Sequence, residues 1–239
     1  MSESGRADVL FANARLATLV PLDDGYGIVE DGAVAVRGGR IAWVGRRADA
    51  PKAAAVHDCD GLWLTPGLVD CHTHIVYAGN RSDEWEARLN GASYEDIARA
   101  GGGIMSTVRA TRLASETELK ELMSERLARV LAYGTTTIEI KSGYGLSVEA
   151  EMKSLWAIRD LNTDLQASGT GPRIAATFLG AHAVPEEYSN YSDDYVKLVV
   201  EKMLPEIARE GLAEWLAHHR ASRHMQEPTA SAQCPETPE

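Results

Sequence analysis

The chain has 239 residues, with 24 lysines and arginines against 35 aspartates and glutamates, which gives a net charge of −11. This acidic balance argues against a surface for nucleic acid or for an anionic membrane. A hydrophobic fraction of 44% suffices for a packed core, but no run approaches the roughly 20 apolar residues of a membrane span. The polar N-terminus lacks a signal-peptide apolar region. Three sparse cysteines (Cys59, Cys71 and Cys234) indicate a reducing compartment, so we expect a cytoplasmic protein.

The first part of the chain, residues 1–65, is predicted to be a small β-domain. Its strands are expected at residues 9–11, 16–20, 33–36 and 41–45, and residues 56–64, with Asp60 and Gly61 inside them, are expected to form a further turn and strand. Gly38 and Gly39 lie between the third and fourth of these strands, which predicts a hairpin turn. The result is a small open sheet of β-sandwich type, whose edges need cover.

The stretch 65–74 (Thr-Pro-Gly-Leu-Val-Asp-Cys-His-Thr-His) begins with a Pro-Gly break and leads into a buried strand expected at 69–76. Side chains alternate faces along a strand, so His72 and His74 point the same way, roughly 6–7 Å apart. Two converging imidazoles are typical of the first pair of ligands of a divalent metal. The alternative is a pair of ordinary core or surface histidines.

A polar loop at 78–84 follows that strand and carries Arg81, whose planar fork of donors suits a carboxylate. The alternative for Arg81 is a solvated side chain. Three glycines at 101–103 indicate a loop that approaches a site closely, without the Gly-Lys-Ser/Thr of a phosphate loop. Ser93 is expected to cap a short helix to residue 100. Ser115 and Glu118 form a capping box for a helix to about residue 133.

Two further strands alternate with helices in the second half of the chain. Strands are expected at 135–140 and 173–179, and the loops that follow them carry Tyr144 and His182. Ser147 is expected to cap the intervening helix, a helix over 195–208 should kink at Pro205, and a fourth strand is expected after Gly211. This rhythm predicts parallel strands with helical crossovers, an α/β fold.

The composition changes at residues 215–239, where neither helix nor strand periodicity persists. The last dozen residues have the composition of disorder. His218, His219 and His224 make a second metal site conceivable, but we prefer the hypothesis that this divergent tail is out of register with its parent family, through a frameshift or a truncation.

The motif at residues 66–74 resembles the first barrel strand of the metal-dependent amidohydrolases. Four segments together are similar to the imidazolonepropionase family, namely 72–81, 101–104, 139–146 and 178–185. The resemblance covers residues 8 to about 213. It implies a partial TIM-like (β/α)8 barrel over 66–214, preceded by a small β-domain. In the family, strands from the C-terminal end of the chain complete that small domain.

The resemblance also implies a reaction, the hydrolysis of 4-imidazolone-5-propanoate to N-formimidoyl-L-glutamate in histidine degradation, with one bound divalent metal ion, zinc or iron. His72 and His74 would be metal ligands, Arg81 would hold the propanoate carboxylate, and Tyr144 and His182 would line the substrate pocket. The substrate is a small molecule, and homo-oligomers are compatible with the resemblance.

The family's other metal ligands and its proton-handling glutamate come from strands that these 239 residues do not contain, so no catalytic residue is assigned. Since catalytic sites usually have three protein ligands, we expect the chain alone to be poorly folded or inactive. Two alternatives stay open: an amidohydrolase or deaminase acting on another ring, and a non-catalytic remnant that associates with a partner.

Overall fold

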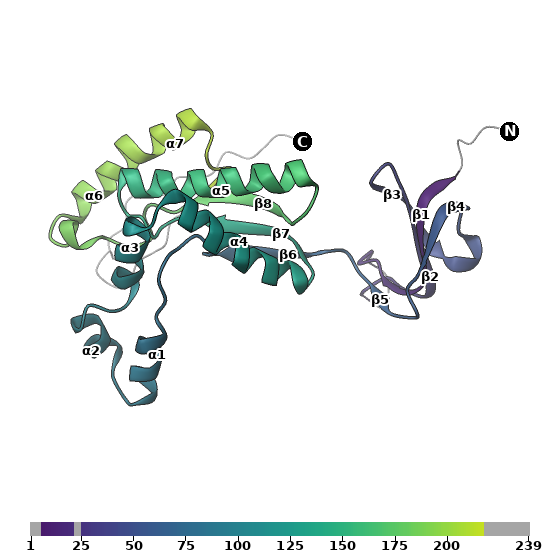
Figure 1. Ribbon diagram of the computed structural model, residues 1–239, viewed down its shortest axis with the longest axis horizontal. Coiled ribbons are helices and arrows are strands. Elements are labelled where there is room, and N and C mark those ends of the chain that lie inside the picture. Colours follow the sequence, from purple (N-terminus) through teal and green to yellow (C-terminus); the bar gives the residue numbers. More distant parts are fainter. Residues whose placement is uncertain (1–5, 22–24, 218–239) are drawn as a thin grey trace. The chain divides into compact units, whose positions relative to one another are not determined.

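Figure 1 shows the computed structural model, which describes residues 6–21 and 25–217. The chain divides into two compact units, Met1–Gly67 and Leu68–Glu239. None of the helices in the described part of the chain is long and apolar enough to cross a bilayer.

The first unit is a five-stranded sheet. Its elements are β1 (Ala7–Ala17), β2 (Ile28–Arg37), β3 (Arg40–Arg46), the 3-10 turn Arg47–Asp49, β4 (Ala53–Asp58) and β5 (Trp63–Leu64). The strand order is β3-β2-β1-β4, and β5 pairs with β1. The described strands of this unit form one sheet, so the β-sandwich part of the prediction is not confirmed. The hairpin is confirmed, because Gly38 and Gly39 have the positive φ angles of 56° and 71° that its turn requires.

The prediction of two short strands at 9–11 and 16–20 was wrong, since β1 runs unbroken from Ala7 to Ala17. Its pairing with β2 shifts register on both sides of Ala14, and the first shift spans Asn13, whose φ of 56° is left-handed. Asparagine tolerates this conformation better than most residues. A bulge therefore carries the strand through a polar stretch that looks like a turn in the sequence.

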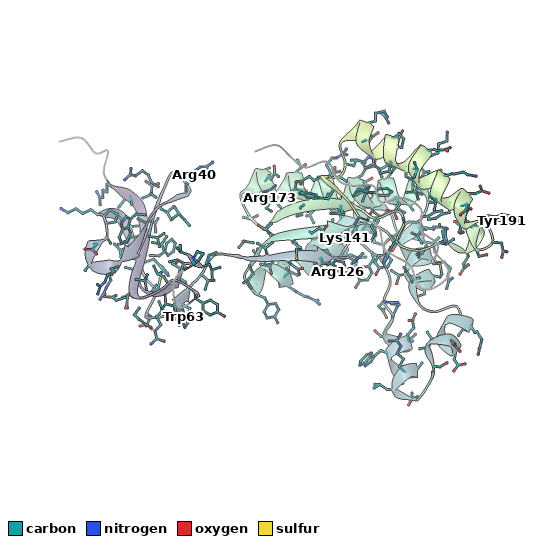
Figure 2. All side chains as sticks on the ribbon, turned by 180° about the vertical axis from the view of Figure 1, so that it is seen from behind. Arg40, Trp63, Arg126, Lys141, Arg173 and Tyr191 are labelled. Carbon is teal, nitrogen blue, oxygen red and sulfur yellow. The ribbon has the colours of Figure 1, made fainter. Side chains whose placement is uncertain are left out.

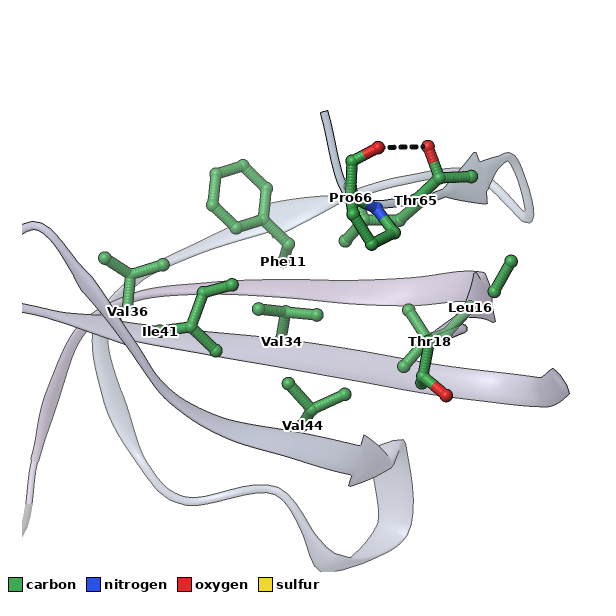
Figure 3. A pocket seen from close by; sticks show the side chains of 11 residues that line it. Phe11, Leu16, Thr18, Val34, Val36, Ile41, Val44, Thr65 and Pro66 are labelled. Atoms are coloured by element: carbon green, nitrogen blue, oxygen red, sulfur yellow. Dashed lines mark hydrogen bonds between the residues drawn. The ribbon is translucent and has the colours of Figure 1, made fainter. Parts of the chain in front are cut away.

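One face of this sheet carries an apolar hollow of about 310 Å³ (Figure 3). Side chains from β1, β2 and β3 line it, including Phe11, Val34, Val36, Ile41 and Val44. Ile41 is 70% exposed. The sheet thus presents apolar side chains that the described part of its own unit leaves open to solvent.

The second unit alternates strands with helices. Its helices are α1 (Ser82–Leu89), α2 (Tyr94–Arg99), α3 (Ile104–Leu113), α4 (Glu116–Ala132), α5 (Val148–Ser168), α6 (Ser192–Leu198) and α7 (Leu204–Glu210), with a 3-10 turn at Glu186–Tyr188 and a π-turn at Val199–Met203. Its strands are β6 (Leu68–Thr73), β7 (Thr135–Lys141), β8 (Arg173–Phe178) and β9 (Trp215–Leu216). All four are parallel in the order β6-β7-β8-β9, which confirms the α/β prediction and makes a partial, half-barrel sheet.

The two faces of the parallel sheet differ in character because side chains alternate along each strand. Helices α4 and α5 lie over one face (Figure 1). The residues buried on that side include Ile138, Ile140, Ile174, Phe178, Met123, Leu155 and Ile158. The intervening positions of β7 are polar: Thr137, Glu139 and Lys141. The polar positions are therefore available to a site, while the apolar ones hold the layers together.

The predicted caps are confirmed, since the Ser115 and Ser147 side chains accept hydrogen bonds from the first turns of α4 and α5. The predicted kink near Pro205 is a π-turn directly before α7, as expected where proline removes an i→i−4 bond. One prediction needs correction, because the loop predicted at 78–84 already enters α1 at Ser82. The three glycines are outside the helices, as expected, and lead directly into α3.

The fourth strand predicted after Gly211 is present as β9, which pairs with β8. It occupies Trp215–Leu216, where the composition predicted the tail to begin, so the change of pattern starts inside the sheet. The predicted disorder and His218, His219 and His224 lie outside the described residues.

Candidate metal and substrate site

The two histidines of the predicted metal pair lie at the carboxyl end of β6. His72 is in the strand, and His74 lies just beyond it, because β6 ends at Thr73 rather than at the predicted residue 76. The two rings are 5.3 Å apart between centroids. The Thr73 hydroxyl donates to the carbonyl of Glu139 on β7, which keeps the chain beside the sheet as regular pairing ends. The pair therefore converges even though the strand is shorter than expected.

His182 and Tyr144 meet the same pair from the loops after β8 and β7. The rings of His74 and His182 are stacked, with centroids 4.8 Å apart. The ring of Tyr144 lies 5.8 Å from His74 and 5.2 Å from His182. Parallel strands end on one edge of a sheet, and barrel enzymes place their chemistry there. The structure thus brings together four of the five predicted site residues.

Arg81, the fifth, is exposed at the start of α1, where it lines a hollow of about 150 Å³ with Glu84, Trp85 and Arg88. Its charge acts on the Tyr144 phenol and opposes the rise in the pKa of that group. Arg81 is therefore near enough to influence the ring cluster electrostatically without lying within it.

Burial shifts the pKa values of two members of the cluster, His74 and Tyr144. Burial, assisted by the neighbouring charges of His182, His72 and Lys141, lowers the pKa of His74 to about 4, against a weaker opposing effect of the Ser142 backbone. The imidazole is therefore neutral at pH 7. Burial also raises the pKa of Tyr144, which keeps its phenol protonated.

His182 has a defined tautomer when its ring is neutral. Its Nδ1 lies 2.9 Å from the carbonyl oxygen of Gly143. A carbonyl oxygen only accepts, so Nδ1 carries the proton and the ring's lone pair is on Nε2. Nε2 is the atom that could accept a proton or approach a ligand.

A polar group on the inner face of the sheet was missed by the sequence reasoning. Glu139 accepts hydrogen bonds of 2.6 Å from both Lys141 and Thr177. Burial raises the pKa of Glu139, but these two bonds together with the charges of Lys141 and His72 outweigh it and hold that pKa below its usual value. Its signal was the alternation of Thr137, Glu139 and Lys141 on a strand whose other residues are apolar. Tyr77, 5.8 Å from Tyr144, was also missed.

The donor set fits part of a metal site. His74 Nδ1 is buried and has no hydrogen-bond partner among the described residues, as an unfilled ligand atom would. Among those same residues, however, no group of three or more His, Cys, Asp or Glu side chains could hold an ion. The pair therefore fits two positions of a coordination sphere, and a catalytic site usually has three protein ligands.

Solved structures define the class of this fold. A 5-methylcytosine deaminase from Klebsiella pneumoniae aligns with a TM-score of 0.53 at 14% identity, covering 87% of this chain and 50% of that one. A triazine hydrolase from Arthrobacter aurescens aligns with a TM-score of 0.52 at 18% identity, covering 88% and 46%. These neighbours show an α/β fold. No family model matches the chain.

Curated sequences give a more specific likeness. Imidazolonepropionases from Ralstonia nicotianae and Caulobacter vibrioides are 54% and 57% identical to this chain over 212 and 211 residues, and one from Shewanella halifaxensis is 48% identical over 212. Each alignment covers 87% of this chain and 51% of the relative, so the chain spans about half the length of these relatives. The resemblance to imidazolonepropionases predicted from the motifs is confirmed.

Proposed function

We propose that this chain carries one side of an imidazolonepropionase active site, which hydrolyses 4-imidazolone-5-propanoate to N-formimidoyl-L-glutamate. The observation that carries the proposal is the convergence of His72, His74, Tyr144 and His182 at one end of the parallel sheet, in a chain 48–57% identical to curated relatives of that name. A cytoplasmic location belongs to the proposal and is supported by the free thiols of Cys59 and Cys71.

His72 and His74 would hold the divalent metal, zinc or iron. Such an ion polarises a carbonyl oxygen and activates water at neutral pH. The protein prepares for it by keeping His74 neutral and its Nδ1 without another partner. An imidazole must be unprotonated to bind a metal, so the depressed pKa removes competition from protons.

Tyr144, His182 and Arg81 would position the substrate. The phenol of Tyr144 remains a donor because burial raises its pKa. Arg81 would pair with the propanoate carboxylate, and a bidentate pair fixes orientation as well as affinity. His182 would present Nε2 to the ring, since Nδ1 donates to Gly143.

Zinc binding tests the metal part of this proposal. Titration with Zn²⁺ against a competing chelator should show a site that is at least about 10-fold weaker in His72→Ala and in His74→Ala, the smallest loss seen for outer-shell partners. His57→Ala in the first unit is the matched control, because His57 is an exposed histidine on β4. Equal affinities in all three variants would contradict the assignment.

Ligand discrimination tests the substrate part. Arg81→Ala should weaken binding of 4-imidazolone-5-propanoate by about 10–100-fold, the value of a charge-assisted hydrogen bond, and should leave an imidazolone without the propanoate unaffected. Arg99→Ala is the control, because Arg99 is an exposed arginine on α2. If the chain binds both compounds equally well, the substrate assignment is wrong. Turnover should be slow or absent, since the described residues supply two metal ligands only.

A further inference from the structure

The loop that carries Tyr144 is held from the helix side by one buried carboxylate. Glu151 lies in the first turn of α5 and is 0% exposed. It accepts hydrogen bonds from the backbone amides of Gly143, Gly145 and Leu146 at 3.0, 2.8 and 2.9 Å. These amides flank Tyr144 on both sides, so one side chain fixes the backbone around it.

An arginine from a different helix holds the carbonyl side of the same loop. Arg112 of α3 donates to the carbonyl oxygens of Gly145 at 2.7 Å and Leu146 at 2.9 Å. Its other contact is an ion pair of 2.7 Å with Glu187, which lies in the turn that follows the His182 loop. Arg112 therefore joins the loop after β7, which carries Tyr144, to the segment after β8, which carries His182.

The held backbone is strained, which is why it needs both anchors. Leu146 has a φ of 50° and is fully buried, a left-handed conformation that a branched side chain seldom adopts. Gly143 has a φ of 108°, and its carbonyl accepts from His182. Conformations of this kind persist where the surroundings over-determine them, and they gather at functional sites.

We propose that Glu151 and Arg112 are positioning residues for the site, which set the Tyr144 phenol and, through Gly143, the His182 imidazole against His74. Their hydrogen bonds to the loop run to its backbone rather than to the Tyr144 ring. Their importance to catalysis rests on the proposed function, while their control of the loop does not. A purely structural carboxylate, serving only to cap α5, would leave the Tyr144 ring unmoved when altered.

Fluorine NMR of the full chain labelled with 3-fluorotyrosine tests the proposal without metal or substrate. The Tyr144 resonance is identified by its loss in Tyr144→Phe. In Glu151→Gln, which keeps one acceptor oxygen and places an amide donor near the Gly143 N–H, that resonance should move by more than its linewidth. The exposed Tyr26 and Tyr133 should not move. Glu149→Gln, two residues away and exposed on the same turn, makes the same charge change and should leave Tyr144 in place.

Arg112→Lys provides a second variant, because lysine cannot span two carbonyl groups and Glu187 with one planar fork. It should also move the Tyr144 resonance, and it decides the question if Glu151→Gln does not fold by circular dichroism. An unmoved Tyr144 resonance in either folded variant overturns the proposal. If zinc and substrate binding fail while Tyr144 still moves, the proposed function is wrong and the positioning role stands.

Discussion

Gly143 is the position where the site's geometry is most sensitive to one added carbon. A Cβ there would lie 2.8 Å from the Leu179 carbonyl oxygen and 2.9 Å from the Cβ of His182. Gly143→Ala should lose about 1–2 kcal/mol to left-handed backbone strain and about 1–3 kcal/mol to overpacking. The expected total is therefore about 2–5 kcal/mol of unfolding free energy, and His182 must move away from position 143.

Urea unfolding followed by circular dichroism at the helix signal measures this loss, since the described α-helices all belong to the second unit. The midpoint should fall by about 1–2 M at ordinary slopes. Gly169→Ala is the control: its φ is 65°, but nothing lies within 4 Å of the new Cβ, so it should lose only the strain of about 1–2 kcal/mol. Equal losses in the two variants would refute the argument that His182 is held by close approach to Gly143.

Three further predictions concern the contributions of single side chains to stability. In metal-free protein, the free energy of unfolding should fall by about 1–2 kcal/mol as the pH drops from 6.5 to 4. Over this range His74 becomes protonated in the unfolded chain but stays largely neutral in the folded one, where its pKa is about 4. Chemical denaturation of His74→Gln should show a smaller fall. Arg126→Met should lower the free energy of unfolding by about 2–4 kcal/mol, since the guanidinium donates to two carbonyl groups after β6 and lies 3.7 Å from the centroid of the Tyr77 ring. The control Arg129→Met, at an exposed position of the same helix, should change it by no more than about 0.5 kcal/mol. Similar thermal shifts in the two variants would contradict the prediction. Tyr195→Phe should lower the free energy of unfolding by about 1–2 kcal/mol, because it removes the 2.6 Å hydrogen bond from the Tyr195 hydroxyl to the buried carbonyl oxygen of Gly180. Tyr191 is 65% exposed, so Tyr191→Phe should leave the melting temperature unchanged.

Figure 2 labels Arg126 and Lys141, two residues of the second unit that illustrate what the sequence could and could not predict. The alternation of β7 and the caps at Ser115 and Ser147 were accessible, because each depends on residues a few positions apart. The placement of Tyr144 and His182 near His74 was implied by the resemblance, and the parallel order of β6, β7 and β8 explains why the three side chains converge. Arg126 was not accessible, since its partners are backbone carbonyls about 50 positions earlier in the chain.

In the first unit, the prediction from local sequence was wrong about strand β1. The sequence predicted two separate strands, and Asn13 lies in the stretch between them, residues 12–15. The bulge keeps the strand continuous because tertiary pairing with both β2 and β4 outweighs local propensity. Local rules therefore fail where a neighbouring strand supplies the missing hydrogen bonds.

Glu151 and Arg112 were hidden for a related reason. In the sequence each is a charged residue on a helix, and the ordinary expectation for such a residue is a solvated face. Full burial of a carboxylate is costly unless donors surround it, and here the donors are three amides of a single loop. Backbone donors have no side-chain signature, so a residue that orders a loop in this way cannot be distinguished from a surface charge until the loop is folded against it.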